Sequence, residues 1–151
     1  MNNYNDIPIF PLKSIILPGG QFPLRIFERR YLDMIRDSLK TNSGFVIALT
    51  KKDADYISSV HDYACYVEIV DWSQLDGGLL GVTVEGKILV TLSNCKLDET
   101  NLLRGNAQQI KASIDHLIPQ KYQILSKFYR KIYPEIKAYI FHNKSKYNDA
   151  N

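Results

Sequence analysis

Hydrophobic and polar residues alternate along much of the first two thirds of the chain, and this pattern predicts β-strands whose two faces meet different surroundings. It is clearest in residues 80–92, where the even positions are apolar or glycine while the odd positions include Glu85 and Lys87. Such alternation predicts one long half-buried strand, or two strands that join at Gly86. Because glycine has no side chain to pack, Gly86 is expected to form a bulge or a bend.

Further strands are predicted on both sides of this segment. Residues 45–49 form an uninterrupted apolar run, which is typical of a strand covered on both faces. Residues 64–70 are rich in β-branched and aromatic side chains and predict another strand. The remaining predictions are strands at 7–12, 23–28 and 106–117, a polar loop at 51–59, and turns at 71–78 and 96–105.

Two segments carry apolar residues at the three- to four-residue spacing of an amphipathic helix. The apolar stripe of the first runs from Tyr31 to Leu39, and Gly44 is expected to close this helix in the left-handed conformation. The second is predicted from Pro119 to about Phe141, where Pro134 can introduce a kink.

Short strands joined mostly by turns, with helices grouped on one side, predict an α+β architecture. The expected fold is an antiparallel β pseudo-barrel with a short helix, followed by a C-terminal helix. A chain of 151 residues is long enough for one domain with its own core. We therefore expect a β domain at residues 1–118 and a helical extension at residues 119–151.

The sequence contains two blocks of characteristic segments: Ile7–Leu12, Leu17–Gly20, Pro23–Glu28 and Arg30–Ile35 in the first, and Glu68–Trp72 with Asp76–Gly86 in the second. In the same order, these blocks resemble the amino-terminal substrate-binding domain of the Lon ATP-dependent protease, and more closely the stand-alone Lon-N-like proteins. The resemblance covers most of residues 7–92, and it is strongest in the first 40 residues.

This resemblance implies a PUA-like β fold followed by a helical subdomain. It also implies that the domain selects and holds protein substrates. The chain departs from the family at Ala64-Cys65, where members usually carry Gly-Thr, and in its short helical end. A function that needs the full helical bundle is therefore not implied.

The sequence carries no motif for ATP hydrolysis or peptide cleavage. The phosphate-binding pattern G-x-x-x-x-G-K-[ST] does not occur, and Gly19-Gly20 reads as a turn between strands. The serine–lysine peptidase part of Lon has no counterpart in these residues. Asp71 and Asp76 flank a predicted hairpin turn, where aspartate is favoured for backbone hydrogen bonding. The chain is therefore expected not to be an enzyme.

No metal or cofactor site is expected. Cys65 and Cys95 are 30 positions apart, and no histidine stands at metal-ligand spacing beside either of them. Both cysteines are expected to be small buried residues. The polar start lacks a basic segment, and no apolar run approaches the roughly 20 residues of a membrane helix, so a cytoplasmic location is expected.

Large apolar residues beside the predicted turns are candidates for binding protein. Four residues form this predicted protein-binding site: Phe22, Pro23, Phe27 and Trp72. Exposed together, they could grip unfolded polypeptide or a protease or chaperone partner, so that the chain acts as an adaptor. The same residues could instead be core, which is the favoured interpretation for Phe27, while Phe22 and Trp72 are evenly balanced.

Charge distribution provides an alternative. Residues 120–151 contain seven basic and two acidic residues, whereas residues 1–119 contain 12 basic and 14 acidic residues. Basic residues interleaved with tyrosines could follow a nucleic-acid backbone. The alternative hypothesis is therefore an RNA-binding module that uses Lys127, Arg130, Lys131 and Lys137. The sequence is also compatible with a homodimer.

Overall fold

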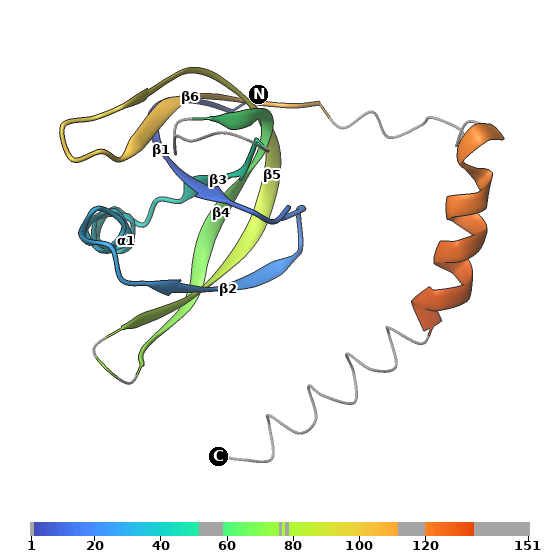
Figure 1. Cartoon of the computed structure of the whole chain (residues 1–151), viewed down its shortest axis with the longest axis horizontal. Helices are drawn as coiled ribbons and strands as arrows, with labels where there is room; N and C mark the ends of the chain where they lie inside the picture. Colours follow the sequence, from blue (N-terminus) through green and yellow to red (C-terminus); the bar gives the residue numbers. More distant parts are fainter. Residues whose placement is uncertain (1, 52–58, 76, 78, 112–119, 135–151) are drawn as a thin grey trace. The chain divides into compact units, whose positions relative to one another are not determined.

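The computed structural model describes residues 2–51, 59–75, 77, 79–111 and 120–134. They belong to two compact units, Met1–Lys111 and Ala112–Asn151, which we describe separately. The described residues of the first unit form six strands and one α-helix (Figure 1). In the second unit, residues 123–134 are α-helical and follow a short 3₁₀ turn, η2 (Gln120–Tyr122). None of the helices in these described ranges is long and apolar enough to cross a membrane.

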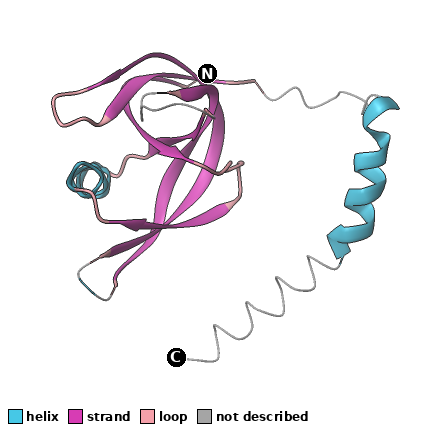
Figure 2. Cartoon of the chain, in the orientation of Figure 1, coloured by secondary structure: helices cyan, strands magenta, loops and turns pink. Residues whose placement is uncertain are grey.

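The strands of the first unit close into a pseudo-barrel (Figure 2). The elements are β1 (Asn3–Leu12), β2 (Gln21–Ile26), α1 (Arg29–Thr41), β3 (Phe45–Thr50), β4 (Val60–Gln74), β5 (Leu80–Leu97) and β6 (Leu103–Gln109). Their order in the sheet is β2-β5-β4-β3-β1-β6, and β6 also pairs with β5, which closes the sheet on itself. The predicted α+β pseudo-barrel is therefore confirmed.

One strand pair departs from the antiparallel prediction. β1 and β3 are parallel, whereas the other strand pairs in the described residues are antiparallel. Parallel neighbours need a long crossover connection. The segment that contains β2 and α1 supplies it, so the helix that the sequence predicts is also the element that makes a parallel pair possible.

The long strand β5 bends at Gly86, as predicted. Its first part pairs with β2, its last part pairs with β6, and the register with β4 shifts where Gly86 meets Val67. The turn before β2 bonds to this point: the Gly19 amide donates to the Gly86 carbonyl (2.8 Å), and the Gly86 amide donates to the Gly20 carbonyl (2.9 Å). A Cβ atom at Gly86 would overlap the carbonyl oxygen of Leu17, so only glycine fits there.

Two apolar clusters lie on opposite faces of the central strands. In β3, Phe45 and Ile47 pack with α1 residues, whereas Val46 and Ala48 belong to the cluster of the barrel interior. Successive side chains of a strand point to opposite faces. β3 is therefore covered on both faces, as its apolar run predicts.

Several element boundaries differ from prediction. β4 continues to Gln74, beyond the predicted end at residue 70, and β6 begins at Leu103, inside the predicted turn at 96–105. Both extensions pair with β5, and this pairing exists only in the folded sheet. The predictions for residues 52–58, 112–119 and 135–151, including the 118/119 boundary, lie outside the described residues.

The helix ends differently from the prediction. Asn42, not Gly44, takes the left-handed conformation, with φ of 48°, and its amide donates to the Ser38 carbonyl. Asparagine tolerates this region better than most residues. Gly44 is needed for another reason: a Cβ atom there would overlap the Val67 carbonyl oxygen, and its amide donates to the Tyr66 hydroxyl (2.8 Å).

Gly86→Ala should destabilise the first unit by about 2–4 kcal/mol, because the added methyl meets fixed backbone and not a movable side chain. Urea unfolding would measure this loss. Thr83→Ala, on the same strand, is the matched control and should cost less than about 1 kcal/mol. Equal stability of the two variants would show that the close approach of the Leu17 carbonyl to Gly86 is not required for the stability of the first unit.

Candidate functional site

The four residues of the predicted protein-binding site occupy different environments. Phe22 is half-buried and packs against the cluster shared with α1, while Pro23 is exposed. Trp72 is 58% exposed and Phe27 is 70% exposed. The assignment of Phe27 to the core is wrong. β2 ends at Ile26, which is 1% exposed, and the chain then turns towards α1, so the next side chain is left outside the core.

Strand register divides these residues between the two faces of the sheet. Phe22 pairs with Val84, and Trp72 pairs with Val82, on the face that also carries buried Leu24. Pro23 lies between Phe22 and Leu24 on β2, so it points to the opposite face. The structure therefore leaves Phe27 and Trp72 as the large exposed members of the predicted set.

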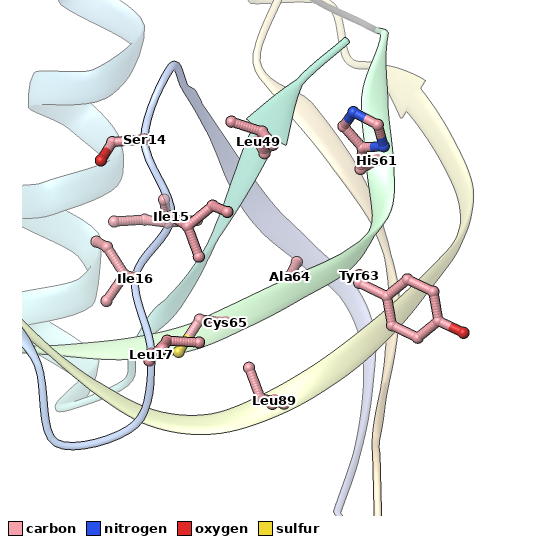
Figure 3. A pocket seen from close by; sticks show the side chains of 11 residues that line it. Ser14, Ile15, Ile16, Leu17, Leu49, His61, Tyr63, Ala64, Cys65 and Leu89 are labelled. Carbon is pink, nitrogen blue, oxygen red and sulfur yellow. The ribbon is translucent and has the colours of Figure 1, made fainter. Parts of the chain in front are cut away.

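The structure contains a pocket that the sequence does not predict. It has a volume of about 350 Å³ and lies between the loop that follows β1 and strands β3, β4 and β5 (Figure 3). Its lining is mostly apolar. The lining residues are Ser14, Ile15, Ile16 and Leu17 from the loop, Ile47 and Leu49 from β3, His61, Tyr63, Ala64 and Cys65 from β4, and Leu89 from β5.

A row of side chains across three strands forms the floor of the pocket and reaches its rim at Leu89. Cys65 pairs with Ile47 on one side and with Leu89 on the other, so the three project from the same face of the sheet. Ile47 and Cys65 also belong to the apolar cluster that contains α1 residues. The pocket is therefore a continuation of the sheet face that α1 covers.

The rim of the pocket exposes large apolar side chains. Ile15 is 66% exposed, Leu17 59%, Tyr63 73% and Leu89 38%. Between Ile15 and Leu17, the side chain of Ile16 is buried in the cluster with α1 and fixes the loop. We call Ile15, Leu17, Tyr63 and Leu89 the apolar rim.

The pocket suits a neutral apolar group. Burial raises the pKa of the Cys65 thiol, although a hydrogen bond from the Lys87 backbone opposes this shift, so the thiol is protonated at neutral pH. Two polar side chains of the lining, His61 and Tyr63, are exposed to solvent. In the described ranges, no group of three or more His, Cys, Asp or Glu side chains could hold a metal ion.

The two cysteines differ, which corrects the prediction that both are buried. Cys65 is buried, whereas Cys95 is exposed. The register between β5 and β6 shifts between Ser93 and Lys96, and Asn94 has a positive φ of 53°. Cys95 therefore lies in an irregular part of the strand, where alternation no longer predicts which side chains are buried.

Two signals in the sequence point to the apolar rim. Ile15, Ile16 and Leu17 form an apolar run immediately before a Pro-Gly-Gly turn, where a short loop cannot bury all three. Leu89 is a large apolar residue among the mostly polar odd positions of residues 80–92. Neither signal shows that the two segments meet, because the contact depends on the fold of β5 around Gly86.

The predicted RNA-binding residues lie in the second unit. Lys127, Arg130 and Lys131 are exposed on the helix of residues 123–134, and their spacing of three and four residues places them on one side of it. Lys137 lies outside the described residues. The same helix exposes Phe128 and Tyr129, among other apolar side chains.

Comparison with known proteins identifies the family. Residues 6–150 match the family described as the ATP-dependent protease La (LON) substrate-binding domain. This chain therefore belongs to the Lon substrate-binding domain family, a class of substrate-recognition modules. A search of curated proteins found no match.

Solved structures agree with this assignment. The chain is similar to a Lon N-terminal domain protein from Xanthomonas campestris, with a TM-score of 0.69, 26% identity, and coverage of 87% of this chain and 73% of that chain. It also shares the fold of the N-terminal domain of a Mycobacterium avium complex Lon protease, with a TM-score of 0.62, 15% identity, and coverage of 97% and 75%.

The contrast between the cysteines predicts their reactivity. A thiol reagent should modify Cys95 in the folded protein and Cys65 only after unfolding. Partial desolvation of the sulfur by its neighbours raises the pKa of exposed Cys95, and Asp62 adds to this shift, so its reaction should be slow at neutral pH and accelerate as the pH rises. Absorbance of the released leaving group would follow both reactions. Cys95→Ser should remove the native-state reaction, and its persistence in that variant would contradict the burial of Cys65.

Proposed function

We propose that this chain is a non-catalytic module that binds exposed apolar segments of unfolded proteins and presents them, as an adaptor, to a protease or chaperone partner. The observation that carries this proposal is the exposure of Phe27 and Trp72 in a member of a substrate-binding family. Large aromatic side chains are frequent anchors of protein interfaces, because they bury a large area with few rotatable bonds.

The energetic argument favours a binding role for these two residues. A large apolar side chain gains about 1.5–3 kcal/mol when it leaves water completely. Phe27 and Trp72 forgo most of this gain in the folded chain, since more than half of each remains exposed. A client segment with its own apolar side chains would recover it without any change in the core.

Local hydrogen bonding supports the absence of catalysis. The Asp71 carboxylate accepts a hydrogen bond from the Trp72 amide (2.9 Å), which is the backbone role expected of an aspartate near a turn. Among the described residues that line the pocket, Cys65 carries a protonated thiol and none carries a carboxylate. These features support binding without chemical conversion.

Replacing Phe27 and Trp72 by Ser should weaken capture of an unfolded client protein by at least about tenfold, since each aromatic anchor typically contributes more than 1 kcal/mol. Binding of a permanently unfolded, labelled client, followed by fluorescence anisotropy, would measure the change. Phe22 is not used, because it packs against the core and its loss would also destabilise the fold.

Leu39→Ser is the matched control, because Leu39 is an exposed apolar residue of α1. It should leave client binding unchanged. If the Phe27/Trp72 double variant binds the client as tightly as the control does, the two aromatic residues are not the contact surface.

RNA binding is the second candidate, and one observation favours it. Residues 120–134 contain four basic residues and no acidic residue. Three of them, Lys127, Arg130 and Lys131, share one side of the helix. A basic helical face of this kind can follow a phosphate backbone.

If RNA binds to this helix, replacing Lys127, Arg130 and Lys131 by Gln should abolish most of the affinity, and the affinity of the unchanged chain should fall steeply with salt. Filter binding to a single-stranded RNA at several salt concentrations would test both expectations. A salt-independent affinity would exclude this candidate. Lys13→Gln, in the first unit, is a single-charge control and should have little effect.

A further inference from the structure

We propose that the apolar rim and the pocket beneath it form a second subsite, which takes one large apolar side chain, such as Phe or Leu, from an extended segment of an unfolded client. This inference rests on the proposed function. The second subsite is distinct from the predicted protein-binding site. Its apolar rim consists of Ile15, Leu17, Tyr63 and Leu89, none of which belongs to the predicted protein-binding site.

The exposed area favours a short segment as the occupant. At roughly 200 Å² for a large side chain, the exposed fractions of the four rim residues amount to less than about 500 Å². A stable interface between folded proteins needs about 800 Å² on each partner. The rim is therefore too small to hold a second copy of the chain alone, but it is large enough to cover one or two residues of an extended peptide.

The volume of the pocket suits a single large side chain. An apolar cavity of about 150 Å³ can hold a benzene ring. The pocket measures about 350 Å³, which leaves space for one aromatic or branched side chain together with the backbone that carries it. A polar drug-sized ligand would need convergent polar groups in the lining, which is instead mostly apolar.

The floor of the pocket disfavours a charged occupant. The floor includes the buried side chains of Ile47 and Cys65, and burial raises the pKa of the Cys65 thiol, which keeps it neutral. A charged group placed on this floor would lose its hydration without finding a partner. In Figure 3, the hydroxyl groups of Ser14 and Tyr63 point away from the other lining side chains.

The new subsite is separate from Trp72. Cys65 and Trp72 are seven positions apart on β4, which corresponds to about 23 Å along the strand. A client must therefore place two apolar residues at least about seven positions apart to reach both sites. Spacing of this kind would favour long unfolded segments over short peptides.

The test uses isotope-labelled protein and a pair of soluble twelve-residue peptides. Both peptides consist of Gly, Ser, Thr and Gln, and one carries a single central Phe where the other carries Ala. The Phe peptide should shift the amide resonances of Ile15, Leu17, Tyr63 and Leu89, and the Ala peptide should not. Ile15→Ser/Tyr63→Ser should weaken the Phe peptide at least about tenfold, whereas Leu97→Ser, a control at an exposed apolar position elsewhere, should not.

The alternatives give different results. If the Phe peptide shifts only Trp72 and its neighbours, the second subsite does not exist and the proposed function stands. If neither the peptide nor an unfolded client binds, both proposals fail. If sedimentation shows a dimer that the Ile15/Tyr63 variant loses, the occupant is a second copy and the subsite proposal is wrong. Leu89→Ala provides a second variant, should the double variant be unstable.

Discussion

The backbone pairing between the Pro-Gly-Gly turn and Gly86 is the constraint on which the first unit depends. Two hydrogen bonds tie Gly86 to Gly19 and Gly20, and the absence of a Cβ atom lets the Leu17 carbonyl approach. Because β5 bends at this point, its first part can pair with β2 while its last part pairs with β6. The same contact holds the Ile15–Leu17 loop beside the sheet, so barrel closure and the pocket have one structural cause.

The first unit combines a packed core with apolar side chains that remain exposed outside this core. α1 covers one part of the sheet face with Met34 and Ile35, and the exposed apolar rim continues that face beyond the helix. Trp72 lies on the same face, at the far end of the β4–β5 hairpin. A surface of this kind suits partners that are apolar but have no fixed shape. Contact with such partners requires exposed apolar side chains on a rigid sheet and does not require close shape complementarity.

Local sequence patterns predicted the strands whose formation depends mainly on residues close together in the sequence. The alternation of residues 80–92 predicted β5 and its bend, and the apolar run at 45–49 predicted a strand covered on both faces. Phe27 and Cys95 were misjudged because their exposure depends on where a strand ends and where its register shifts, which only the neighbouring strands determine. The pocket could not be predicted, since four segments far apart in the sequence form it. The parallel pairing of β1 with β3 depends in the same way on the whole sheet.

The position of β1 has a consequence for the order of events during synthesis of the chain. β1 lies between β3 and β6, and the Asp6 carboxylate pairs with Arg104 (2.9 Å) while the Gln109 amide donates to the Asn2 carbonyl (3.0 Å). One edge of this first strand thus stays open until residues 103–109 have left the ribosome. Contacts between residues so distant in sequence make folding slow. A nascent chain of this protein therefore exposes, for a time, an unpaired strand edge.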